Sequence, residues 1–198
     1  PAYPASVLHP KYWAEPLWAG TDSAQAIRLP NGFRHVSEQI RAASWTPTKA
    51  TRIRIPEIGV DSPVNELQIL DLGSSSAYET PDNVVGHIPI TANPGQSGNG
   101  WFFGHLESPV KKEGNVFARL PEIRTIVEEY GDPVYIVLES DWGEFLYQVS
   151  GGTVVHQSEL RLYESAAATV TLVTCVPRLV YDHRLLVSAE LVGIQTKN

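Results

Sequence analysis

From Thr51 onward, the chain alternates apolar and polar side chains in short stretches that are typical of β-strands. Arg52-Ile53-Arg54-Ile55-Pro56 puts every second side chain on one face, as a half-buried strand does. Turn residues separate such stretches at short intervals, which favours an all-β barrel or sandwich. The other predicted strands are 60–67, 101–103, 133–139, 144–155, 170–174 and 185–192, and 133–139 and 144–155 form a hairpin around Asp141-Trp142-Gly143.

Three segments between these strands show a different pattern. Gly86 to Gly100 is rich in Gly, Pro and Asn, which predicts a shaped loop. Val116 to Leu120 has the spacing of a single helical turn, and Glu159 to Ala168 is predicted as a loop or a helix-like excursion.

Residues 1–48 differ from the rest of the chain, and we predict that they form an N-terminal appendage or stalk on a main domain of residues 49–198. Trp13, Trp18 and Trp45 lie here among frequent prolines, which prevent a long regular element. One short helix is predicted over 33–43, where three apolar residues share a face. The aromatic content is higher than in a disordered tail.

Composition narrows the class of protein. Fifteen glycines and fifteen prolines suit a fold with many turns better than a helical bundle. The net charge of −7 and the lack of a basic stripe argue against a nucleic-acid binder. No apolar run approaches the roughly 20 residues that span a bilayer. A single cysteine excludes an intrachain disulfide and a cysteine-rich zinc site.

That cysteine, Cys175, ends a predicted strand on the face opposite Val170 and Leu172. Arg184 begins the next predicted strand nine positions later, so a hairpin can place both residues at one end of neighbouring strands. A nucleophilic thiol needs a base or cation nearby, and acyl transfer needs donors for the developing oxyanion. A guanidinium is always charged and offers several donors.

A proton carrier for the leaving amine is the third requirement, and six histidines are available. His105 ends an apolar strand directly after Gly104, where a glycine permits close backbone approach. His87 also follows a glycine, and His183 is predicted on the face opposite Arg184. The pattern therefore ranks His105 first.

Four motifs in order resemble the sortase family of cysteine transpeptidases. Thr171-Leu172-Val173-Thr174-Cys175 is similar to the sortase TLxTC signature, and Arg184 with Leu185-Leu186-Val187 resembles the strand that follows it. Gly86 to Gly95 and Gly98 to His105 resemble the family's GHxPxTAxPGxxGN…GH block. Ile55 to Val60 resembles its first-strand IPxIGV motif. The resemblance covers 51–192 and departs from the common pattern at Ile90 and Trp101.

The resemblance implies an all-β fold, a closed eight-stranded β-barrel with short helices, in a catalytic domain of residues 49–198. It also implies that His105, Cys175 and Arg184 are the catalytic residues, and that Thr171 and Thr174 bind or position the substrate. The implied substrate is the LPxTG-like sorting-signal peptide of secreted surface proteins, and the acceptor is an amine of a cell-wall peptide or a pilin lysine. The implied location is the extracytoplasmic face of the bacterial membrane, with an anchor outside these 198 residues.

Further expectations concern the N-terminal region and bound groups. Trp13, Glu15 and Trp18 loosely resemble the lid of some pilin sortases, and the alternative is that these aromatics pack on the flank of the barrel. The carboxylates at 107, 113, 159 and 164 have no ligand spacing, so no metal is predicted, and no cofactor is expected. A monomer is expected.

Two other interpretations stay open at this point. A cysteine peptidase would hydrolyse the same thioester, whereas a non-catalytic β-barrel would use its groove only to bind a peptide. The second interpretation predicts an unreactive Cys175.

Overall fold

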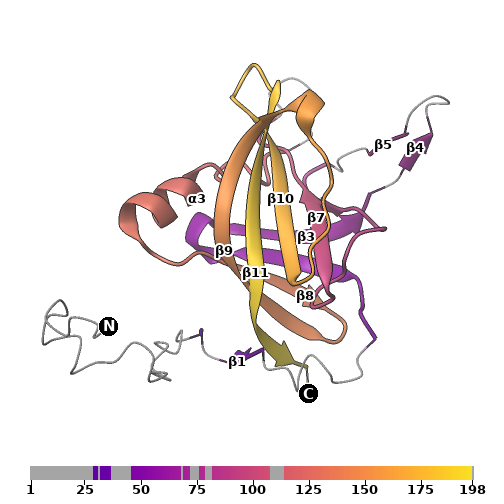
Figure 1. Cartoon of the computed structure of the whole chain (residues 1–198), viewed down its shortest axis with the longest axis vertical. Helices are drawn as coiled ribbons and strands as arrows, with labels where there is room; N and C mark the ends of the chain where they lie inside the picture. The colour runs from indigo at the N-terminus through magenta and orange to yellow at the C-terminus, as the bar shows by residue number, and fades with distance from the viewer. Residues whose placement is uncertain are drawn as a thin grey trace, which may run out of the picture. The chain divides into compact units, whose positions relative to one another are not determined.

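The computed structural model describes residues 29–30, 32–36, 46–67, 69–71, 76–78, 82–107 and 114–197. Its main feature is a nine-stranded sheet in the order β1-β11-β10-β7-β6-β3-β2-β8-β9, closed by pairing of β9 with β11 (Figure 1). β1 lies outside this closure, so eight strands form a closed β-barrel, as predicted. The strands of the sheet are β1 (Arg34–His35), β2 (Ala50–Ile55), β3 (Val60–Glu66), β6 (Val85–His87), β7 (Gly98–Phe103), β8 (Tyr135–Ser140), β9 (Gly143–His156), β10 (Ala168–Val176) and β11 (His183–Thr196).

Every second side chain along a strand points into the barrel, and these side chains form its core. Leu172 of β10 and Leu185 and Val187 of β11 belong to the main core, together with the fully buried Ile53 and Phe102 of β2 and β7. Residues next to these in sequence point outward, because successive side chains of a strand lie on opposite faces. Outward-facing Val173 and Leu186 belong to a second, smaller apolar cluster with Leu67, Ile88 and Trp101.

The predicted strands and the hairpin around Asp141-Trp142-Gly143 are confirmed, since β8 pairs with β9 from Tyr135 opposite Gln148 to Glu139 opposite Glu144. Beyond Gln148, β9 leaves β8 and continues along β11 alone, up to His156 opposite His183. The pairing of β9 with β11, which closes the barrel, therefore extends as far as the predicted site.

Several elements were not predicted or were predicted wrongly. The short helix α3 (Glu122–Thr125) runs into η2 (Ile126–Tyr130), and a small separate sheet pairs β4 (Ile69–Asp71) with β5 (Ser76–Tyr78). The segment from Gly86 to Gly100, predicted as a loop, contains the end of β6 and the start of β7. The helix expected over 33–43 is wrong at its start, because Arg34–His35 forms β1 against β11. The remaining short elements are η1 (Pro56–Ile58) and η3 (Gln157–Glu159).

The chain divides into two compact units, Pro1–Asn31 and Gly32–Asn198, and the barrel belongs to the second. β1 therefore belongs to the barrel unit although it precedes the predicted division at residue 48. Among the described residues, no helix is both long and apolar enough to cross a membrane.

Candidate active site

Cys175 and Arg184 lie directly opposite each other in the antiparallel pairing of β10 and β11. Neighbouring strands are about 4.8 Å apart, and opposite residues of an antiparallel pair share a face. Val173 and Leu186 form the pair two positions away on this face, within the second apolar cluster. The thiol and the guanidinium therefore start from adjacent strands at the end of an apolar outer surface, and both residues are partly exposed.

His105 follows β7, the strand on the other side of β10. β7 runs parallel to β10, and the last registered pair is Phe103 with Val173. The Gly104 N–H donates to the Val173 carbonyl at 3.1 Å, and the Thr174 hydroxyl donates to the Gly104 carbonyl at 2.9 Å. These two bonds hold the chain beside β10 up to His105, so His105 and Arg184 come from the strands that flank Cys175.

Gly104 cannot carry a side chain in this arrangement. A Cβ added there would lie 2.5 Å from a ring carbon of Phe117 and 2.7 Å from a methyl carbon of Val116. The Phe117 N–H also donates to the His105 carbonyl at 2.9 Å. The turn at 116–120, which was predicted from the sequence, thus packs against the backbone that presents His105.

Neutral oxygens surround the guanidinium of Arg184. Nη1 donates to the carbonyls of Tyr181 (2.8 Å) and His183 (2.9 Å), and Nη2 donates to Oε1 of Gln157 at 3.1 Å. Within the described part of the chain, no carboxylate forms an ion pair with Arg184. Within these described residues, neutral groups alone therefore hold its positive charge in place.

Glu107 links the loop between β10 and β11 to the segment that follows His105. Its carboxylate accepts a hydrogen bond from the Tyr181 hydroxyl at 2.8 Å and forms an ion pair with Arg178 at 3.2 Å. Sequence reasoning treated Glu107 only as a scattered carboxylate. Its contacts join the backbone near His105 to the loop whose Tyr181 carbonyl binds Arg184.

Tyr163 fixes the connection between β9 and β10 onto the outer face of the sheet. Its hydroxyl is 3.0 Å from the hydroxyls of Thr171 and Ser188, and its ring packs edge-on against Trp101 at 4.9 Å between centroids. Its carbonyl accepts hydrogen bonds from Trp101 Nε1 at 3.3 Å and Asn99 Nδ2 at 3.4 Å. Sequence reasoning missed Tyr163, because all of these partners are far from it along the chain.

The two threonines of the predicted site are buried rather than open to a substrate. Thr171 is fully buried, and its hydroxyl is bound by Asn99 and Tyr163. Thr174 is 2% exposed and binds Gly104. Both side chains therefore hold neighbouring strands and the Tyr163 segment, which fits a positioning role better than direct contact with a substrate.

Of the other histidines considered, His87 is an internal residue. It is 1% exposed, stacks on Phe102 at 4.7 Å, and its Nε2 lies 3.1 Å from the Ala92 carbonyl. Burial lowers the pKa of His87, which favours the neutral ring. His183 turns away from Arg184 and binds Asp182 at 2.7 Å, and its ring lies against that of His156.

Trp13, Glu15 and Trp18 lie outside the described residues, so the lid stays a prediction. Among the described side chains, no group of three or more His, Cys, Asp or Glu residues could hold a metal ion.

The family model for the sortase domain matches residues 53–192, which is more than half of the chain. The chain belongs to the sortase family. Sortases are cysteine transpeptidases, and this membership decides against the non-catalytic interpretation. The matched region contains β7 with the segment that follows it, β10, and the part of β11 up to residue 192, so it includes all three of the residues that the sequence nominated.

Solved sortase structures share this fold. The chain is similar to the sortase D5 transpeptidase of Clostridium perfringens, at 25% identity and a TM-score of 0.54, with 80% of this chain and 90% of that chain covered. The chain is also similar to sortase C-1 of Actinomyces oris, at 28% identity and a TM-score of 0.51, with 74% of this chain and 75% of that chain covered. Sortase C1 of Streptococcus agalactiae is 27% identical, with a TM-score of 0.52 and coverage of 78% and 72%. No curated protein sequence matches the chain.

Proposed function

We propose that this sortase cleaves an LPxTG-like sorting signal between its Thr and Gly residues and transfers the acyl group to an amine, with Cys175 as the nucleophile. The observation that carries the proposal is the cross-strand pair of Cys175 and Arg184, with His105 presented by the strand on the other side of Cys175. The three residues together supply a nucleophile, a fixed cation and a proton carrier.

In the first half-reaction, the Cys175 thiolate attacks the carbonyl carbon of the peptide bond and a C–S bond forms. Arg184 stabilises the negative oxygen of the tetrahedral intermediate, since its guanidinium already donates to neutral oxygens and has no carboxylate partner in the described chain. His105 gives a proton to the leaving amine as the C–N bond breaks. The products are a thioester on Cys175 and the released C-terminal fragment.

In the second half-reaction, an amine attacks the thioester carbonyl. His105 accepts a proton from this amine, a new C–N bond forms, and the Cys175 thiolate leaves. The acceptor is a cell-wall peptide or a pilin lysine, which corresponds to surface-protein anchoring or pilin assembly on the extracytoplasmic face of the membrane. Thr171 and Thr174 act as positioning residues, because their buried hydroxyls tie β7 to β10 and to the Tyr163 segment.

The test is cleavage of sorting peptides by the full chain, with mass spectrometry of both products. Cys175→Ala should abolish cleavage, and His105→Ala should nearly abolish it. Near-normal turnover of Cys175→Ala would overturn the proposal. Addition of an amine acceptor separates the two enzymatic interpretations, because a transpeptidase gives the amine adduct and a peptidase gives the free acid.

A further inference from the structure

Gln157 contributes a side chain to the surroundings of the Arg184 guanidinium. Its Oε1 accepts a hydrogen bond from Arg184 Nη2 at 3.1 Å, whereas the acceptors of Nη1 are the backbone carbonyls of Tyr181 and His183. A guanidinium has only donors, so it must meet the oxygen of the amide rather than its nitrogen. Within the described chain, this is therefore the contact of Arg184 whose charge a substitution would change.

The pairing of β9 with β11 brings Gln157 to Arg184. Arg184 lies directly opposite Val155 in the antiparallel register. The next residue, His156, has extended backbone angles (φ −65°, ψ 146°), so Val155 and Gln157 share a face. The Gln157 N–H then continues the ladder by donating to the Asp182 carbonyl at 2.9 Å. Gln157 is thus the diagonal neighbour of Arg184, a spacing that long side chains bridge.

Hydrogen bonds within the turn also fix the backbone of Gln157. His156 caps η3, because its Nδ1 accepts the Ser158 N–H at 3.3 Å and lies 2.6 Å from the Ser158 hydroxyl. At the other end of the turn, Arg161 Nη1 donates to the carbonyls of Ser158 and Leu160, at 2.9 and 2.8 Å. The amide is therefore presented to the guanidinium from a backbone that is held both to β11 and across its own turn.

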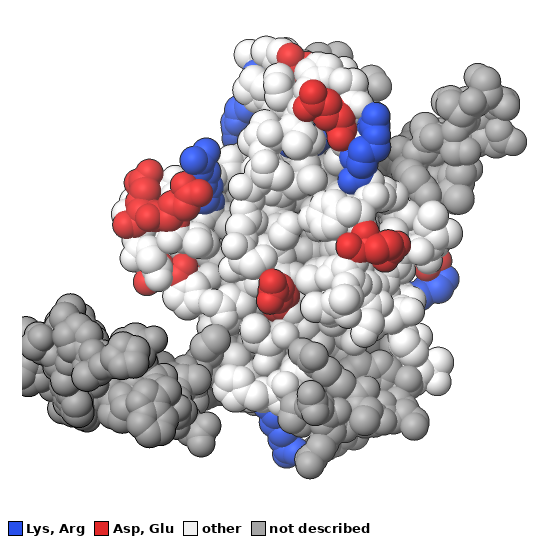
Figure 2. Space-filling view, in the orientation of Figure 1, with Lys and Arg blue, Asp and Glu red and all other residues white. Residues whose placement is uncertain are grey.

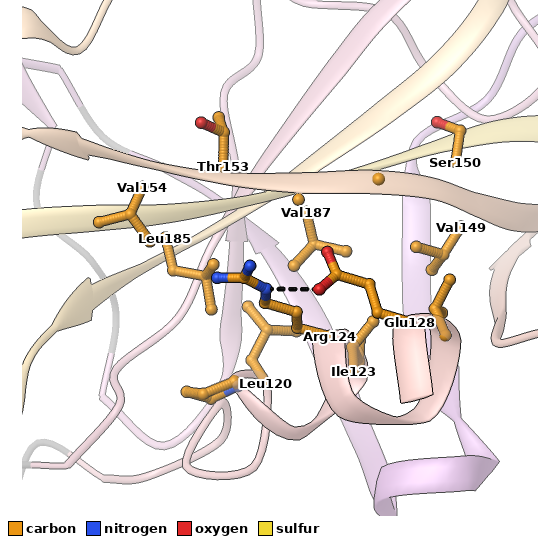
Figure 3. Close-up of a pocket in the computed structure, with 14 residues that line it drawn as sticks. Leu120, Ile123, Arg124, Glu128, Val149, Ser150, Thr153, Val154, Leu185 and Val187 are labelled. Atoms are coloured by element: carbon orange, nitrogen blue, oxygen red, sulfur yellow. Dashed lines mark hydrogen bonds and ion pairs between the residues drawn. The ribbon is translucent and has the colours of Figure 1, made fainter. Parts of the chain in front are cut away.

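Carboxylates, rather than amides, hold several other arginines of the chain. Arg124 of α3 pairs with Glu128 of η2 at 2.8 Å (Figure 3), and Figure 2 shows basic and acidic side chains side by side over this helix. The same kind of ion pair is formed by Arg52, Arg54, Arg119 and Arg178. Arg184 differs from these arginines within the described chain, because its partners are two carbonyls and an amide.

The amide leaves part of the guanidinium for a substrate. Among the described residues, Nη1 of Arg184 donates twice and Nη2 donates once, so the Nε–H and the second Nη2 N–H remain for the oxyanion. A carboxylate uses this same pair of nitrogens, since Asp61 binds Nε and Nη2 of Arg52 at 2.6 and 2.8 Å. A carboxylate at position 157 would therefore withdraw both the donors and the charge.

We propose that Gln157 positions Arg184 and, because it is neutral, leaves the charge and two donors of the guanidinium to the substrate oxyanion. Gln157 acts through Arg184, so it is a positioning residue and not a catalytic one. The inference rests on the proposed function, since it deepens the role given there to Arg184. It predicts that a carboxylate at this position suppresses cleavage, although it preserves the shape of the side chain and its hydrogen bond.

Steady-state cleavage of a sorting peptide by the full chain tests this with two variants of similar shape. Gln157→Glu keeps the acceptor but adds a charge, and it should lower kcat by about tenfold or more with KM within about twofold. Gln157→Met removes the acceptor without adding a charge, and it should lower kcat by only about threefold. A purely structural role predicts the opposite order, because glutamate keeps the hydrogen bond that methionine loses.

Salt separates the added charge from a change of shape. Gln157 is exposed, so the ion pair formed in Gln157→Glu should be screened, and its deficit in kcat should shrink about threefold between about 0.05 and about 1 M NaCl. The deficit of Gln157→Met should not change over this range. Gln195→Glu, near the other end of β11, adds the same charge away from the site and should keep kcat within about twofold of the unsubstituted chain.

The carboxyl introduced by Gln157→Glu also reports the contact without any reaction. Its pKa, followed by carbon NMR, should lie below the ordinary value of about 4.3, because the guanidinium favours the charged form. The pKa should return to that value when Arg184→Met is added. An ordinary pKa in the presence of Arg184 would overturn the proposal.

Two kinetic results would also overturn it. They are a Gln157→Glu chain as fast as Gln157→Met or faster, and a deficit in Gln157→Glu that salt does not relieve. Failure of the unsubstituted chain to cleave any sorting peptide would instead overturn the proposed function, and the oxyanion role of Gln157 with it. The two failures are told apart because the first requires an active unsubstituted chain.

Discussion

Cys175 and Arg184 are direct cross-strand partners in the β10–β11 hairpin, and the guanidinium is further held by the Tyr181 carbonyl at 2.8 Å and by Gln157 at 3.1 Å. Their relative position is therefore set by a hydrogen-bonded strand pair rather than by a loop. Groups carried on a rigid sheet keep their geometry through the reaction, which is the requirement for stabilising a developing charge.

Arg184→Lys should lower kcat/KM for a sorting peptide by about 100-fold, which is the usual cost of losing one oxyanion donor. Lysine keeps the charge but cannot reproduce the planar fork that reaches Tyr181 and Gln157 and still has donors for a substrate oxygen. Steady-state kinetics on both proteins measures the effect. Arg52→Lys, in an exposed ion pair with Asp61 on β2 and β3, is the matched control and should be neutral; unchanged kcat/KM in Arg184→Lys would remove Arg184 from the mechanism.

Gly104→Ala should both destabilise the barrel and impair cleavage. The new methyl group would lie 2.5 Å from Phe117, so either the 116–120 turn or the backbone before His105 must move. Overpacking of this kind costs about 1–3 kcal/mol. Urea unfolding measures the stability, and kcat measures the placement of His105.

Gly151→Ala provides the control for that substitution. Its Cβ meets nothing within 4 Å, so its stability and its cleavage rate should both match those of the unsubstituted chain. If Gly104→Ala were equally harmless, the packing of the turn against Gly104 would have no part in positioning His105.

The strands that sequence reasoning predicted correctly are those whose two faces differ. Cys175 was assigned to the face opposite Val170 and Leu172, and these two residues are indeed in the main core, while Val173, on the same face as Cys175, lies in the outer cluster. Alternation fails where both faces are covered or where pairing is very short. This explains why β6, with three buried residues inside a Gly- and Pro-rich stretch, was predicted as part of a loop.

The site residues likewise fall into those that could be predicted from the sequence and those that could not. Cys175 and Arg184 could be paired from the sequence because a short connection joins consecutive strands, so their separation along the chain fixes their register. Tyr163 and Gln157 could not be found, because their contacts with Asn99, Trp101 and Arg184 arise only when the barrel closes. Short-range patterns carry no signal of such long-range contacts.

Folding stability should fall as the pH drops below about 6.5, in part because of His87. Burial lowers the pKa of His87 in the folded protein, so on acidification the unfolded chain takes up a proton that the folded chain resists. Urea midpoints at about pH 7.5 and about pH 5.5 measure the loss. In His87→Gln, whose amide can still donate to Ala92, the loss should be smaller, whereas the exposed His35→Gln should keep the full pH dependence; an equal loss in His87→Gln would contradict this account.

Tyr163→Phe should raise KM for a sorting peptide several-fold with a smaller change in kcat. The hydroxyl joins Thr171 and Ser188, and its loss costs about 1 kcal/mol per hydrogen bond in holding the 160–167 segment on the outer face. The control is Tyr130→Phe, since Tyr130 is 70% exposed on η2 and away from this face. A fall in kcat alone would instead place Tyr163 in the chemical step.

Thr174 is predicted to position His105 through the backbone, and its two conservative variants separate this role from packing. Its hydroxyl donates to the Gly104 carbonyl at 2.9 Å, one residue before His105, and the side chain is almost fully buried. Thr174→Val keeps the shape but removes the donor and leaves that carbonyl unpaired, at a cost of about 1–3 kcal/mol. We expect a several-fold lower kcat with KM unchanged, and recovery of most of the rate in Thr174→Ser, which restores the hydroxyl. A rate that followed side-chain volume, so that Thr174→Ser was slower than Thr174→Val, would show that packing rather than the hydrogen bond is what matters at this position.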